Sequence, residues 1–193
     1  MQDFRTMTYP EIEHWYQTDF SEAFAENERK PLADIIRLIK EDKYDMWGLF
    51  ENNILLGYAT LWKNNDIPLV LLDYLGVNKD IRSQGIGSQI LRHLKSLSYP
   101  IVTESELPVE GDSPAENEVR MRRMAFYSRN GFVPIYQMAT CGMRWQAFVV
   151  NAERLTTDQT MEWHRALYGP ARKDVKIPLS DGEKPELPYW MIK

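Results

Sequence analysis

The pattern of apolar and polar positions in residues 71–97 predicts a strand that leads through a short turn into a helix. An apolar run ends at Val77, and a polar turn with one arginine and two glycines follows it. Apolar residues then recur at the spacing of one helical face: Ile86, Ile90, Leu91, Leu94 and Leu97. Because the first turn of a helix has unpaired N–H groups and the positive end of the helix dipole, we expect residues 84–88 to bind an anion, most often a phosphate.

The same kind of pattern predicts a mixed α/β fold. Short apolar runs bounded by turn residues predict strands at residues 4–7, 46–50, 54–62, 69–77, 101–107, 132–136 and 144–150. Helical spacing and start signals predict helices that begin after Thr8, at Pro31, at Ile86, at Pro114 and at Thr157. Strands joined by short turns are expected to be antiparallel, whereas the helix between the strands at 69–77 and 101–107 makes that pair parallel.

Short motifs indicate where several of these elements begin and end. Residues 8–11 and 113–116 have the S/T-x-x-E pattern of a capping box, which starts a helix. The asparagines at 52–53 tolerate positive φ and predict a hairpin turn. Gly131 is expected to end its helix in the left-handed conformation.

Length and composition favour one compact domain. The chain has 193 residues and a net charge of −5, from 23 basic and 28 acidic residues. We expect a single domain over residues 1–170 and an extended tail over 171–193, whose apolar end at 189–192 could dock on another surface. The negative charge argues against nucleic acid as a partner, and no apolar run is long enough to span a membrane. No secretory signal is visible and one cysteine permits no internal disulfide, so a cytoplasmic protein is expected, with a homodimer left open.

The polar turn narrows the class of phosphate ligand. A P-loop would need a lysine where Ser88 stands, and a dinucleotide-binding turn would need a third glycine where Ile90 stands. The remaining pattern is R-x-x-G-x-G, formed by Arg82, Gly85 and Gly87, and it closely resembles the acyl-coenzyme-A motif of the GNAT acetyltransferase superfamily. Further along, F-Y-x-x-x-G-F at 126–132 resembles the end of that family's next helix.

This resemblance implies an α/β (α+β) fold with a mixed, mostly antiparallel central sheet, flanking helices and a splayed pair of parallel strands that receives the pantetheine arm. It implies acetyl-CoA as co-substrate, no metal, and an N-acetyltransferase that acetylates a primary amine of a small molecule by direct attack in a ternary complex. A backbone N–H within residues 75–77 would polarise the thioester carbonyl. The coenzyme-binding residues expected on this basis are Leu75, Gly76, Val77, Arg82, Gln84, Gly85, Ile86, Gly87, Ser88 and Arg129.

Two other functions stay open beside this one. A GNAT-like module could bind an acyl-CoA without catalysis, as a sensor or an interaction module. Acetylation of a peptide or a protein terminus would need an open groove, and the sequence does not indicate one.

Acetyl transfer also needs groups that move protons. Tyr127 is the candidate donor to the departing thiolate, and the plainer interpretation is a buried tyrosine beside Phe126. Glu104 and Glu106 alternate onto one face of their strand and are the candidate bases, with Asp73 as the runner-up. The competing interpretation of these carboxylates is that they are solvated groups at strand ends.

The charge of the acceptor is not settled by the sequence. One set of acidic residues favours a cationic amine as acceptor: Glu104, Glu106, Glu110 and Asp112. One set of basic residues favours an anionic acceptor: Arg120, Arg122, Arg123 and Arg129. Helix arginines are most often exposed or paired, as Glu118 with Arg122 would be. Cys141 is expected to be an inert core residue, because neither His93 nor His164 has a spacing that makes it a partner.

Overall fold

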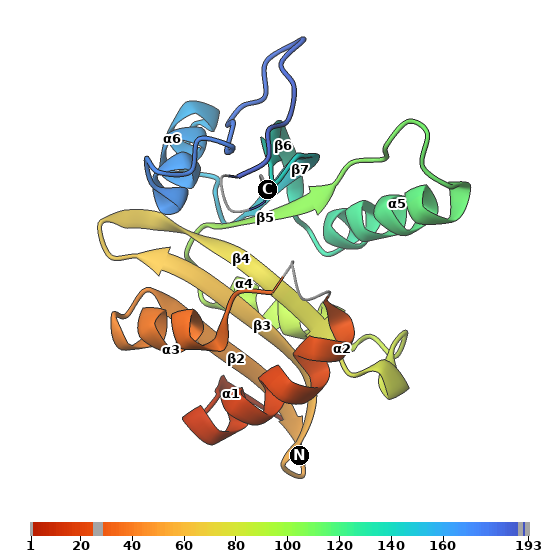
Figure 1. Ribbon diagram of the computed structural model, residues 1–193. Helices are drawn as coiled ribbons and strands as arrows, with labels where there is room; N and C mark the ends of the chain where they lie inside the picture. Colours follow the sequence, from red (N-terminus) through yellow and green to blue (C-terminus); the bar gives the residue numbers. More distant parts are fainter. Residues whose placement is uncertain (1, 25–28, 189–190, 192–193) are drawn as a thin grey trace. The chain divides into compact units, whose positions relative to one another are not determined.

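The computed structural model describes residues 2–24, 29–188 and 191, and the chain divides into two compact units (Figure 1). The first unit comprises Met1–Asn65 and Leu72–Ser98, and the second comprises Asp66–Leu71 and Tyr99–Lys193. Strand β4 (Ile67–Val77) contributes residues to both. The strands form a mostly antiparallel sheet with one parallel pair and flanking helices, which confirms the predicted fold class. The single domain over residues 1–170 stays a prediction.

In the first unit the strands follow the order β1 (Gln2–Thr6), β2 (Tyr44–Glu51), β3 (Ile54–Asn64) and β4. β2 pairs antiparallel with both β1 and β3. The hairpin between β2 and β3 turns at Asn52 and Asn53, whose φ angles of 50° and 65° are the left-handed values that a two-residue turn requires. The predicted hairpin is therefore confirmed.

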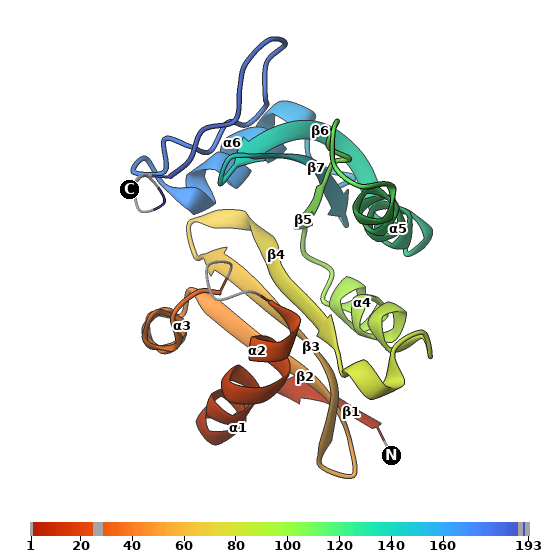
Figure 2. The same cartoon turned by 45° about the vertical axis from the view of Figure 1, so that its right-hand side comes forward.

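Helices cover both faces of these strands. α1 (Tyr9–Trp15), the π-helical turn Tyr16–Phe20, α2 (Ser21–Ala23) and α3 (Leu32–Lys40) lie on one face, and α4 (Ile86–Ser96) lies on the other (Figure 2). α1 begins at the predicted capping box, where the Glu11 carboxylate accepts a hydrogen bond of 2.7 Å from the Thr8 N–H. Burial of apolar side chains holds the first face together, and its largest buried members are Trp15, Phe20, Ile35, Tyr44 and Tyr58.

In the second unit the strands follow the order β4, β5 (Ile101–Glu106), β7 (Met143–Val150) and β6 (Val133–Thr140). β5 and β6 each pair antiparallel with β7. The helices of this unit are α5 (Pro114–Arg129) and α6 (Thr157–Tyr168). The predicted limits of α5 are confirmed, because Ser113 Oγ accepts a hydrogen bond of 3.2 Å from the Glu116 N–H and Gly131 has a φ of 85°.

Strand β6 extends to Thr140, so the prediction that it ends at residue 136 was wrong. Pro134 and Gly142 had obscured its limits. The register shifts between Pro134 and Tyr136, and β6 is an edge strand, where a proline without an N–H is tolerated. Cys141 and Gly142, with φ angles of 52° and 77°, form the turn into β7.

The described part of the tail is attached to β6, and its extended form stays a prediction. Ala139 and Lys176 exchange two backbone hydrogen bonds, of 3.0 and 2.9 Å. The Leu179 N–H donates to the Gln137 carbonyl at 2.8 Å. The predicted docking of residues 189–192 falls outside the described residues, except for Met191.

A buried ion pair anchors the start of this tail. The Asp174 side chain is 2% exposed and accepts hydrogen bonds from the Arg172 guanidinium at 2.9 Å and from the Cys141 N–H at 3.1 Å. Burial alone would raise the pKa of the Asp174 carboxyl, but the hydrogen bonds and charge of Arg172 outweigh it and lower the pKa to about 2.

We expect Asp174→Asn to destabilise the protein at neutral pH and to have little effect in acid. A lowered pKa contributes stability above the ordinary pKa of 3.8, and this contribution is lost as the pH falls from about 4 towards 2. The shift corresponds to about 2 kcal/mol at pH 7. Urea unfolding of both proteins at pH 7 and pH 2 measures the difference, with Asp181→Asn, an exposed aspartate of the same tail, as the control. An equal loss at both pH values would contradict the linkage.

Candidate functional site

The polar turn before α4 is exposed and its backbone is open. Arg82, Ser83, Gln84 and Gly85 are exposed, and Ile86 is buried as the first residue of the helix. Gly85 has a φ of 84°, which favours glycine, and a Cβ atom built on it meets no heavy atom within 4 Å. A ligand can therefore approach the backbone here without displacing a side chain.

The first turn of α4 is electrostatically unlike the other described helices. Each of the others has an acidic residue in its first turn: Glu11 in α1, Glu22 in α2, Asp34 in α3, Glu116 in α5 and Asp158 in α6. The first turn of α4 has none, and no side chain caps it. No acidic side chain or side-chain cap therefore competes for the first-turn N–H groups of α4, and the anion site expected there stays a prediction.

The end of β4 packs closely against β3. A Cβ atom on Gly76 would lie 2.3 Å from the ring of Tyr58, and one on Gly57 would lie 2.8 Å from the Gly76 carbonyl oxygen. A glycine is therefore required at position 76 because strand β4 packs closely on Tyr58. The sequence analysis named Gly76 as a coenzyme-binding residue and did not include this packing role. Its neighbours Leu75 and Val77 are half-buried, and the Arg82 Nε–H donates to the Val77 carbonyl at 3.4 Å.

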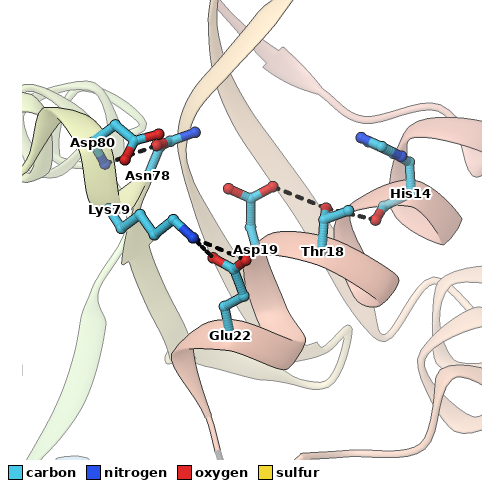
Figure 3. A pocket seen from close by; sticks show the side chains of 7 residues that line it. All are labelled: His14, Thr18, Asp19, Glu22, Asn78, Lys79 and Asp80. Atoms are coloured by element: carbon cyan, nitrogen blue, oxygen red, sulfur yellow. Dashed lines mark hydrogen bonds and ion pairs between the residues drawn. The ribbon is translucent and has the colours of Figure 1, made fainter.

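A polar pocket of about 260 Å³ lies between the helical segment 14–22 and the short 3-10 helix Lys79–Ile81 (Figure 3). Its lining residues are His14, Thr18, Asp19, Glu22, Asn78, Lys79 and Asp80. The Lys79 ammonium lies 3.0 Å from the Glu22 carboxylate. The pocket directly precedes the polar turn in the chain, and no sequence pattern had indicated it.

Tyr127, in the second unit, packs among aromatic rings. Its ring centroid lies 5.7 Å from that of Phe132 and 5.9 Å from that of Phe148. Burial raises the pKa of the Tyr127 phenol, and a hydrogen bond with Thr103 opposes the rise. The hydroxyl is therefore protonated at neutral pH and can donate a hydrogen bond. Arg129, the last residue of α5, is exposed, and its Cζ lies 5.3 Å from the ring centroid of Phe126.

Glu104 is held by two residues of α6. Its Oε1 accepts a hydrogen bond of 2.8 Å from the Tyr168 hydroxyl and lies 2.9 Å from His164 Nε2. His164 is completely buried, and its Nδ1 lies 2.9 Å from the Tyr136 hydroxyl. The sequence analysis weighed His164 only as a partner of Cys141. Glu104 and His164 are too far apart in the chain for a local motif to link them.

Glu106 has a different environment from Glu104. It lies 3.1 Å from Arg120 Nε and 3.7 Å from Arg123. Arg120 also pairs with Asp112 at 2.7 Å. Four of the residues that had given opposite indications of acceptor charge are thus paired with one another, so these four indicate neither charge: Glu106, Asp112, Arg120 and Arg123. The predicted pair of Glu118 and Arg122 is present at 3.9 Å.

Comparisons with known proteins agree with this fold. Residues 42–134 match a family model described as an acetyltransferase (GNAT) domain. The YjbC protein of Bacillus subtilis (strain 168), which has the name of an acetyltransferase, is 32% identical over 119 residues, or 62% of this chain. The chain spans 56% of that relative's length.

Solved structures show the same fold at lower identity. A GNAT-family protein of Bacteroides thetaiotaomicron is 23% identical, with a TM-score of 0.63 over 86% of this chain and 98% of that one. An aminoglycoside 6'-N-acetyltransferase complexed with coenzyme A is 11% identical, with a TM-score of 0.56 over 77% of this chain and 96% of that one. Over the described part of the chain, no group of three His, Cys, Asp or Glu residues could hold a metal ion. None of the helices described there has the length and apolar character needed to cross a membrane.

Proposed function

We propose that this protein is an acetyltransferase of the GNAT family, whose domain model matches residues 42–134, and that it transfers an acetyl group from acetyl-CoA to a primary amine of a small molecule. The observation that carries the proposal is the exposed turn 82–85 together with the first turn of α4, which has no acidic residue; the R-x-x-G-x-G pattern extends over both. Backbone N–H groups of residues 84–88 would bind the pyrophosphate, with Arg82 and Arg129 as side-chain partners of the phosphates.

The reaction needs one attack and two proton transfers. The amine nitrogen attacks the thioester carbonyl carbon, the C–S bond breaks and an amide forms. A backbone N–H within residues 75–77 would stabilise the charge on the carbonyl oxygen. Glu104 would take the proton of the amine, directly or through water, and Tyr127 would donate to the departing thiolate.

Release of free thiol, measured with acetyl-CoA and a panel of amines, tests this function. An amine-dependent signal supports the enzyme. Tight coenzyme binding without turnover on any amine supports the alternative, a module that binds acyl-CoA as a sensor. One observation favours that alternative: Glu104, Glu106 and Tyr127 all have partners within their own unit.

We expect Tyr127→Phe to slow the chemical step by one or more orders of magnitude while coenzyme affinity stays the same. The substitution removes only the hydroxyl and keeps the ring that packs on Phe132 and Phe148. Single-turnover rates and calorimetric titration with CoA separate the two effects.

Thr103→Val is the matched control, since it removes the intramolecular partner of the Tyr127 hydroxyl and leaves the phenol in place. The rate should fall in Tyr127→Phe and not in Thr103→Val. If both variants lose stability and keep the parent rate, the hydroxyl is a hydrogen-bonding group of the core.

A further inference from the structure

The ammonium group of Lys30 lies inside a partly closed ring of aromatic side chains. Its Nζ is 4.7 Å from the ring centroid of Trp62 and 5.8 Å from those of Tyr44 and Tyr74. The Asp73 carboxylate lies 3.2 Å from the same nitrogen. We call Tyr44, Trp62, Tyr74 and Asp73 the ammonium cage.

The residues of the cage come from the sheet, and one of them also contacts the main chain of Lys30, because the Lys30 N–H donates to the Tyr74 hydroxyl at 3.1 Å. The cage residues belong to β2, β3 and β4, and Tyr44 is 1% exposed. The Tyr44 hydroxyl donates to the Asp73 carboxylate and lies 2.8 Å from Thr60 Oγ1, which also accepts a hydrogen bond from the Tyr74 N–H at 2.9 Å. Lys30 enters from the segment before α3. These hydrogen bonds within the sheet orient the side chains of the cage. A cation other than the Lys30 ammonium could therefore occupy the same place.

Aromatic faces and a carboxylate together select a cation. Each ring centroid is within about 6 Å of the nitrogen, the range in which ring faces attract an ammonium group. The side chains of Lys30 and Asp73 are 19% and 16% exposed, so the pair is largely but not completely removed from water. An alkyl ammonium ion would gain both interactions, whereas a neutral molecule of the same shape would gain only apolar contact.

The cage also lies near the part of β4 proposed to hold the thioester. Asp73 precedes residues 75–77 on the same strand. Two residues of strand span about 7 Å, roughly the length of a short alkyl amine. A cation held at Asp73 could therefore place an attached group close to the backbone that would polarise the carbonyl.

We propose that the ammonium cage is a subsite for the acceptor, an unbranched aliphatic diamine, which holds one nitrogen as an ammonium ion while the other nitrogen, neutral, attacks the thioester, and that Lys30 occupies this subsite when no acceptor is bound. This inference rests on the proposed function, because it names the class of amine that the acetyltransferase uses. It resolves the charge of the acceptor, which the paired acidic and basic groups near α5 left open.

Three variants of Lys30 and its cage test the proposal with n-butylammonium, which matches the end of a lysine side chain. Lys30→Ala empties the cage, and calorimetry without coenzyme should show binding at least tenfold tighter than to the parent protein. Lys30→Met fills the cage with an uncharged chain and should not bind more tightly than the parent. Asp73→Asn in the Lys30→Ala protein should weaken binding at least tenfold. n-Butanol, which has the same carbon chain without the charge, should not bind.

Several results would overturn the proposal: equal n-butylammonium affinity in the parent and Lys30→Ala, equal affinity for n-butanol, or no effect of Asp73→Asn. Thiol release from acetyl-CoA in the presence of 1,4-diaminobutane, which has a second nitrogen to attack the thioester, then separates the two proposals. Binding of 1,4-diaminobutane in the cage without acetylation means that the cation subsite is real and the proposed function is wrong. Acetylation that is unchanged by Asp73→Asn means that the function is right and the amine binds elsewhere.

Discussion

Gly87→Val is expected to abolish coenzyme A binding while the protein keeps its fold. Gly87 lies in the first turn of α4, where backbone N–H groups are proposed to contact the pyrophosphate, and a branched side chain there would stand between backbone and ligand. Each lost hydrogen bond to a charged phosphate should cost about 1–3 kcal/mol, and a steric clash should cost more. Calorimetric titration with CoA measures the loss.

The fold should survive this change because valine is a better helix former than glycine. Ser96→Val, at the exposed last residue of the same helix, is the control for a β-branched substitution in α4. It should bind CoA like the parent protein. Unchanged affinity in Gly87→Val, with an unchanged melting temperature, would show that the ligand does not use this turn.

Glu104→Gln is expected to lower turnover by ~100 to 10,000-fold, the usual range for a positioned acid or base. The amide keeps the size of the side chain but cannot accept the proton of the amine, so the acidic limb of the pH–rate profile should also flatten. Steady-state rates of thiol release from pH 5 to 9 provide both measurements.

Glu106→Gln is the matched comparison, because the two glutamates lie on the same strand, β5, and differ in their partners. Two arginines already compensate the charge of Glu106, whereas Glu104 faces a tyrosine hydroxyl and a buried histidine. We therefore expect the larger loss at position 104. If both variants keep the parent rate and pH dependence, then Asp73, a water chain or the solvent takes the proton.

Sequence patterns predicted the elements well where a few neighbouring residues decide the structure. The capping boxes at 8–11 and 113–116, the asparagine turn at 52–53 and the glycine after α5 each act through backbone conformation or a hydrogen bond within one turn. α6 has the limits Thr157–Tyr168 that its helical pattern predicted. The exposed turn before α4 and the first turn of that helix belong to this group, because their glycines and their lack of acidic residues in the helix are both local.

The partners of the candidate site residues could not be predicted in this way. Glu104 meets Tyr168 across 64 positions of the chain, and Lys30 meets Asp73 across 43 positions. Such contacts depend on how strands and helices pack, and no spacing rule encodes them. For the same reason the sequence did not show that Arg120, one of the α5 arginines weighed for an anionic acceptor, pairs with Glu106 and Asp112.

The backbone contacts between the tail and β6 affect how the protein meets other copies of itself. β6 is the last strand in the order of the sheet, and the free edge of such a strand can pair with another chain and start aggregation. Residues 176 and 179 take up hydrogen-bonding groups of that edge, and the buried pair of Arg172 and Asp174 holds the tail in place. A protein shortened at residue 170 would retain β6 and lose its cover, so the tail protects the chain against self-association.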